Sequence, residues 1–128
     1  MKALKFTIPV LVLVIASAAA AQNLVSYHSD VGGTIYYYES ESVHKLDAGY
    51  ITVWTLLDGK KNPSLKWETS RILVKIDCDD MTYRRQYGAT YDANRRIIDD
   101  FNSEPEPFPA TPGSSEYALV EAICARYK

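Results

Sequence analysis

Apolar and polar positions alternate through most of the chain after residue 21, and this pattern predicts a β-sheet. Residues 50–57 are apolar on both faces, because Ile51 and Val53 point one way while Tyr50 and Trp54 point the other. A strand of this kind is predicted to lie at the centre of the sheet. Strands are expected over residues 34–38, 50–57, 71–78, 81–92 and 95–101, with a possible first strand over 23–28 and a short extended segment at 43–46.

The last three predicted strands are joined by connections too short for parallel crossovers, so an antiparallel meander is expected. In the 71–78 strand, every second residue from Ile72 to Cys78 is apolar and faces one side. In the 81–92 strand, Tyr83 and Tyr87 are predicted to share a face with Arg85 between them.

A helical pattern follows the last strand. Residues 104–113 hold four prolines and are predicted to form an extended surface connector, an interpretation favoured over a recognition motif. Ser114 or Ser115 then supplies an N-cap, and Glu116 in the first turn suits the helix dipole. The apolar stripe of the helix comprises Tyr117, Val120, Cys124 and Tyr127, with Leu119 and Ile123 beside them.

Cys78 and Cys124 are the only cysteines of the chain. One ends the apolar face of a predicted strand and the other lies on the apolar stripe of the helix, so a disulfide joining helix to sheet is expected. The alternative of a redox thiol is disfavoured because there is no Cys-x-x-Cys pair. The predicted fold class is therefore α+β, an antiparallel sheet of about five or six strands covered by a C-terminal helix.

The first 21 residues have the features of a signal peptide. Lys2 and Lys5 precede an apolar run over 6–15, and Ala19 to Ala21 form a small-residue cleavage site. An uncleaved membrane anchor is disfavoured, since a span needs roughly twenty apolar residues. Cleavage leaves residues 22–128 as one exported domain with no membrane span. No cysteine stands at the end of the leader to accept a lipid anchor, so a periplasmic or secreted form is expected.

The charge and the polar clusters narrow the function. A formal net charge of −2 argues against nucleic acid as a partner. His28 and His44 lie outside any nucleophile motif, and the acids from Asp77 to Asp80 match no known metal-binding loop. No catalytic residue, cofactor or metal is therefore predicted. A hydrolase or metal enzyme using these side chains remains the least favoured alternative.

Several segments, in order and spacing, resemble the surface-adhesin protein E family of Gram-negative bacteria over about residues 34–125. They are Ile35-Tyr36-Tyr37-Tyr38, Ser42-Val43, residues 50–58 followed by Lys60-Lys61 and Pro63, Ile76-Asp77-Cys78, Tyr83-Arg84, and Gly113-Ser114 with Ala122-Ile123-Cys124-Ala125. The resemblance implies an antiparallel sheet with a C-terminal helix and with the two cysteines joined. It also implies an adhesin, because the family is named after a lipid-anchored outer-membrane protein that binds host matrix and serum proteins such as laminin and vitronectin.

The resemblance favours a non-enzymatic binding domain whose partners are host matrix or serum proteins, or an envelope protein. The candidate protein-binding residues are Lys60, Lys61, Trp67, Arg84, Arg85, Arg95 and Arg96. Their alternative interpretation is a solvated face. A second hypothesis is a structural, oligomerising periplasmic module, in which a homodimer would cover an apolar outer sheet face at Trp54 or Leu73.

Overall fold

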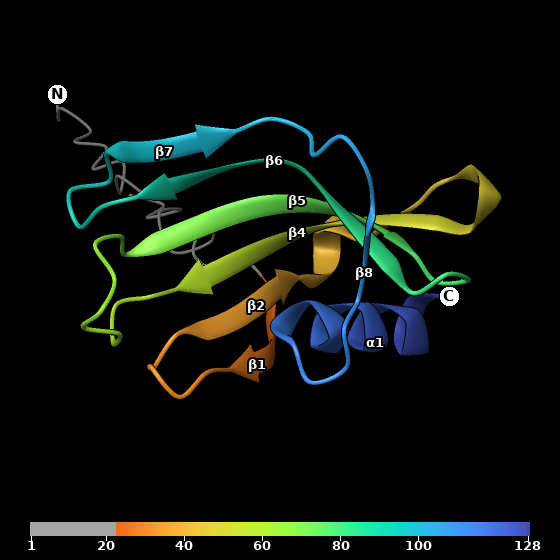
Figure 1. Cartoon of the computed structure of the whole chain (residues 1–128), viewed down its shortest axis with the longest axis horizontal. Coiled ribbons are helices and arrows are strands. Elements are labelled where there is room, and N and C mark those ends of the chain that lie inside the picture. The colour runs from red at the N-terminus through yellow and green to blue at the C-terminus, as the bar shows by residue number, and fades with distance from the viewer. Residues whose placement is uncertain (1–22) are drawn as a thin grey trace, which may run out of the picture.

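Six main strands pair in chain order to form one antiparallel sheet, with a single helix on one side (Figure 1). The computed structural model describes residues 23–128, so the predicted leader at 1–21 lies outside the described residues. The elements are β1 (Leu24–Ser29), β2 (Ile35–Glu39), β3 (His44–Lys45), β4 (Tyr50–Asp58), β5 (Thr69–Asp77), β6 (Thr82–Tyr91), β7 (Ile97–Phe101), β8 (Phe108–Pro109) and α1 (Ser115–Tyr127). Short 3-10 turns at Ser40–Ser42 and Asp47–Gly49 flank β3.

The strand order β1-β2-β4-β5-β6-β7 confirms the predicted antiparallel α+β fold and the terminal meander. β3 pairs with β4, and β8 pairs with β6. β4 has long neighbours on both sides and is central, as its two apolar faces predict.

The proline segment is extended, as predicted, and it also takes part in the sheet. Its β8 pairs with β6 at Thr82 and Tyr83, on the edge of β6 that β7 occupies further along. Pro109 is tolerated there because β8 is an edge strand, where a missing N–H leaves no ladder position empty. Figure 1 shows this segment running from the end of β7 across the sheet to the start of α1.

The core lies between α1 and one face of the sheet. Val53, Ile76, Val120 and Ile123 are all fully buried there. The helix begins as predicted, since the Oγ of Ser114 accepts a hydrogen bond from the Tyr117 N–H at 3.1 Å. The apolar alternation of β4 and β5 therefore faces the apolar stripe of α1.

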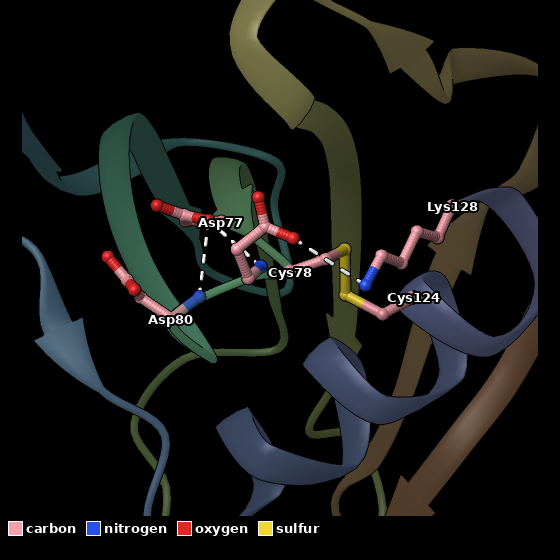
Figure 2. Close-up of a disulfide and its surroundings, with 6 residues drawn as sticks. Asp77, Cys78, Asp80, Cys124 and Lys128 are labelled. Carbon is pink, nitrogen blue, oxygen red and sulfur yellow. Dashed lines mark hydrogen bonds and ion pairs between the residues drawn. A yellow bond between two sulfur atoms is a disulfide. The ribbon is translucent and has the colours of Figure 1, made fainter.

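A disulfide joins Cys78, directly after β5, to Cys124 in α1, which confirms the predicted link between sheet and helix (Figure 2). The two Cα atoms are 5.6 Å apart and 46 residues apart in sequence. Beside it, Lys128 at the chain end lies 3.5 Å from the carboxylate of Asp79. The bond therefore holds the C-terminal helix against the sheet at the end where β5 turns into β6.

A β-bulge in β6 overturns one prediction about side-chain faces. Leu73 pairs with Tyr87 while the next residue, Val74, pairs with Arg85, so Gln86 is an extra residue in β6. Because side chains alternate with a period of two, the extra residue reverses the faces beyond it. Tyr83 and Arg85 therefore face the helix, whereas Tyr87 lies on the opposite face, and the prediction of one shared face was wrong.

Candidate functional site

Three turns gather at one end of the sheet, which we call the loop end. They are the β1–β2, β4–β5 and β6–β7 connections, at residues 30–34, 59–68 and 92–96 (Figure 1). The Glu68 N–H donates to the Tyr91 carbonyl at 2.8 Å, and Asn62 Nδ2 donates to Thr34 Oγ1 at 3.0 Å. These hydrogen bonds join turns that are distant in sequence into one surface.

Five of the seven candidate binding residues belong to the turns of the loop end, and four of these are cations. Lys60, Lys61, Arg95 and Arg96 are all exposed, and within residues 23–128 none of them forms an ion pair. The neighbouring acids are engaged by turn amides instead. Asp58 accepts the Lys60 N–H at 3.0 Å, and Asp92 accepts the N–H groups of Asn94 and Arg96 at 2.8 and 3.0 Å. The loop end therefore presents cations that no carboxylate of the described chain pairs.

Trp67, in the same β4–β5 turn as Lys60 and Lys61, lines a groove of about 450 Å³ on the helix-facing side of the sheet. Its ring packs against Gly59, where an added Cβ would lie 2.9 Å from the ring. Phe101 from β7 lines the same groove. Trp67 is half-buried, so part of the ring supports the β4–β5 turn and part faces the groove.

Arg85 borders that groove but is held internally. Its guanidinium lies 3.7 Å from Glu104 and 3.1 Å from Glu116. Its backbone N–H also donates to the Glu104 carboxylate at 2.9 Å. Arg85 thus links β6 to the proline segment and to the first turn of α1, which leaves it less available to a partner than the loop-end cations.

Three tyrosines surround the N-terminus of α1. Tyr27, Tyr36 and Tyr83 line the same small cavity as Glu116. Burial raises the pKa of all three hydroxyls above their ordinary value. The Tyr36 hydroxyl donates to Asp30 at 3.3 Å, and the Thr34 N–H beside that carboxylate, with Tyr36 in a smaller part, lowers the pKa of Asp30. These hydroxyls stay protonated at neutral pH, and that of Tyr36 acts as a hydrogen-bond donor.

The face of the sheet opposite the helix, which we call the outer face, carries an aromatic and basic cluster that sequence reasoning missed. The Arg71 guanidinium lies 4.0 Å from the centre of the Trp54 ring and 3.0 Å from the Glu39 carboxylate. Tyr87 packs edge-on against Trp54 at 5.4 Å. A shallow groove of about 330 Å³ runs along these residues. The sequence carries only a weak signal for this cluster, because it depends on the strand register and on the bulge.

Arg84 lies further along the outer face, directly across from Lys75 of β5. The seven candidate residues thus divide among the loop end, the groove on the helix side and the outer face. Lys60, Lys61, Arg95 and Arg96 share the loop end with Trp67, which lines the groove on the helix side, whereas Arg84 and Arg85 lie elsewhere on the sheet.

The side chains considered for catalysis are dispersed. His28 stacks edge-on with Tyr36 at 5.2 Å, and His44 is exposed in β3. Over residues 23–128, no three His, Cys, Asp or Glu side chains come close enough together to hold a metal ion. Asp77 instead accepts the backbone N–H groups of Asp79 and Asp80, at 3.0 and 3.3 Å (Figure 2). In the same part of the chain, no helix is both long and apolar enough to cross a membrane.

The fold therefore defines a class of small domains in which a disulfide holds a C-terminal helix against an antiparallel meander. Residues 24–125 match the family described as Surface-adhesin protein E. The chain belongs to this family.

Solved structures of Haemophilus influenzae protein E share the fold. One crystal form is 16% identical in sequence with a TM-score of 0.60, covering 81% of this chain and 88% of that one. A second structure is 14% identical with a TM-score of 0.57, covering 81% and 85%. Protein E from a non-typeable strain is 16% identical with a TM-score of 0.52, covering 81% and 76%. A search among curated proteins finds no match.

Proposed function

We propose that this chain is an exported, non-enzymatic adhesin-like domain that binds a protein. The observation that carries the proposal is membership of the surface-adhesin protein E family over residues 24–125. The partners are host matrix or serum proteins, or a protein of the cell envelope. Residues 1–21 act as a cleaved signal peptide, so the mature domain begins at Gln22 and reaches the periplasm or the medium without a lipid anchor.

The loop end supplies the binding surface in this proposal. The four candidate cations of the loop end need no rearrangement to meet an acidic partner, because within residues 23–128 they are not committed to ion pairs. Such a surface raises the association rate with an acidic protein and makes it sensitive to salt. The turns are held together by hydrogen bonds, so the cations are presented on a fixed base.

The proposal is tested with the domain comprising residues 22–128, its disulfide intact, immobilised for biolayer interferometry. Laminin, vitronectin and an envelope protein extract are passed over it at low and physiological salt. We expect saturable binding that weakens as salt rises. Failure to bind any of the three would remove the support for an adhesin role.

Charge-reversal variants locate the surface. Lys60→Glu with Lys61→Glu is expected to weaken binding at least as strongly as Arg95→Glu with Arg96→Glu. The control is Lys45→Glu in β3, an exposed cation outside the loop end, and losses are compared per reversed charge because it reverses one charge and each double variant reverses two. Equal losses per reversed charge in all three variants would show that overall charge, and not the loop end, determines binding.

The outer face favours a second candidate, the oligomerising envelope module. Trp54, Leu73 and Tyr87 form one cross-strand row on the side of the sheet away from α1. A second copy packed on this row would bury it. Sedimentation equilibrium across a hundredfold concentration range separates the two candidates, since a constant monomer mass would contradict the module. Tyr87→Lys should abolish any dimer that forms there.

A further inference from the structure

Lys75 of β5 and Arg84 of β6 pair directly across the two strands on the outer face. They lie near the β5–β6 turn, at the end of the sheet where the disulfide is. Directly opposed side chains in an antiparallel pair lie close together, and like charges in such positions repel. Neither residue has a carboxylate within ion-pair distance among residues 23–128. The fold therefore places two cations side by side, with no carboxylate of the described residues in direct ion-pair contact with either.

The pair borders a cleft of about 250 Å³. Lys75 is held on one side by the ring of Tyr50, with its Nζ 4.3 Å from the ring centre. Thr82 and Pro107 line the cleft beside Arg84, so a hydroxyl and an apolar wall adjoin the two cations. The cleft thus has defined walls built from three segments of the chain.

No hydrogen bond from Nε holds the Arg84 guanidinium in its observed position. Its Nε is buried and, within the described residues, has no hydrogen-bond partner. Such buried unpaired donors are rare in native structures. Turning the guanidinium toward an acceptor in the cleft would break no hydrogen bond made by Nε, and it would give that nitrogen a partner.

The carboxylates that line the cleft do not serve as acceptors for the Arg84 guanidinium. Asp77 and Asp80 line the cleft at the end nearest the turn. One oxygen of Asp77 already accepts two backbone N–H groups of that turn, from Asp79 and Asp80, and Figure 2 shows this arrangement beside the disulfide. Neither carboxylate lies within ion-pair distance of Lys75 or Arg84, so the charged donors of the two cations stay unpaired by any carboxylate of residues 23–128.

We propose that Lys75 and Arg84 form a binding site for an oxyanion, such as a sulfate or a carboxylate. An oxyanion placed between them would replace the repulsion by two charge-assisted contacts, and the forked guanidinium suits two oxygens at once. The anion comes either from solution or from an acidic side chain of a protein partner. The site is independent of the loop end, so it stands or falls separately from the proposed adhesin role.

The Nε–Hε signal of Arg84 in a nitrogen–proton NMR spectrum reports on the site directly. Sodium sulfate is added to the disulfide-bonded domain at constant ionic strength, with chloride withdrawn. We expect the Arg84 signal to shift along a saturating curve while that of exposed Arg95 moves little. A linear shift of the same size in both arginines would overturn the proposal.

Variants test the second cation. Lys75→Met keeps the aliphatic stem over Tyr50 and is expected to weaken sulfate binding about tenfold, the effect of losing one charge-assisted contact. Lys66→Met, at an exposed lysine of the β4–β5 turn, is the matched control and should leave sulfate binding unchanged. Should Lys75→Met fold poorly, Lys75→Gln serves instead. Unaltered affinity in a folded Lys75 variant would contradict the site.

A second arm of the titration distinguishes the two sources of the anion. A blocked peptide of four glutamates replaces sulfate under the same conditions. Tighter saturation of the Arg84 signal by the peptide than by sulfate would indicate acidic side chains of a partner, whereas saturation by sulfate alone would indicate a small anion. Absence of saturation with both probes would reject the site.

Discussion

Removal of the disulfide is the perturbation whose effect follows most directly from the structure. We consider the variant in which Cys78 and Cys124 are both replaced by alanine. The bond closes a loop whose ends are 46 residues apart in sequence. A loop of this length lowers the entropy of the unfolded chain enough to stabilise the folded state by about 4 kcal/mol in the chain-entropy model.

The expected loss is large relative to the total stability. A small domain unfolds with a free energy of about 5–15 kcal/mol, so the variant should remain folded at 25 °C with a reduced margin. The corresponding fall in Tm is roughly 15–30 °C for a domain of this size. The helix should stay docked, because Leu119, Val120 and Ile123 are buried against the sheet and their apolar contacts do not depend on the covalent bond.

The assay is urea unfolding followed by far-UV circular dichroism and by tryptophan fluorescence. The oxidised protein, the oxidised protein treated with a reductant, and the double-alanine variant are compared. We expect the reduced protein to match the variant, and the reductant to leave the variant unchanged. A loss below about 1 kcal/mol would refute the loop-closure argument, since it would mean that the unfolded chain is already restricted without the bond.

Three further predictions concern the core, one turn and the tyrosines. Ile123→Ala should lower the free energy of unfolding, measured in urea, by about 2–5 kcal/mol because it leaves a cavity under α1. The exposed control Glu121→Ala should change it by less than about 0.5 kcal/mol. Equal effects of the two substitutions would contradict the assigned helix face. Gly59→Ala places a Cβ 2.9 Å from the Trp67 ring and should lower the free energy of unfolding by about 1–3 kcal/mol. It should also shift the maximum of tryptophan fluorescence. An unchanged spectrum would show that the Trp67 ring does not pack against Gly59. Burial raises the pKa of Tyr27 in the folded state, so above pH 10 the unfolded chain loses a proton that the folded chain keeps. The free energy of unfolding should therefore fall as pH rises. A free energy of unfolding that stays constant between pH 9 and 11 would oppose this.

The strands, the helix and the cysteine pair could be predicted because each depends on a local repeat. A period of two in residues 50–57 and a helical period after Ser114 determine which side chains share a face, whatever the rest of the chain does. The N-cap at Ser114 follows from the same local chemistry and is confirmed by its hydrogen bond to Tyr117. Cys78 ends the apolar face of a strand and Cys124 lies on the apolar face of the helix, and these two faces pack together in the core.

The faces of β6 could not be predicted, since one extra residue is invisible to a periodicity argument. Gln86 has no side-chain feature that marks a bulge, yet it moves Tyr87 to the outer face beside Trp54. In β6, Tyr87 pairs with Leu73 and Arg85 pairs with Val74, so Gln86 is left out of the register. This register is decided by which side chains of β6 must reach the core. Packing of the sheet against α1 therefore overrides the simple alternation.

The sequence by itself determined the main strands and the helix, the antiparallel meander and the core-facing residues of β4 and β5, because short-range periodicity and turn chemistry act between near neighbours. Only the tertiary structure decided which charges meet. The loop end joins Lys60 to Arg95, Arg85 is held by two carboxylates, and Lys75 opposes Arg84. These juxtapositions depend on strand register and on the path of the chain between strands, which set distances that spacing along the sequence does not contain.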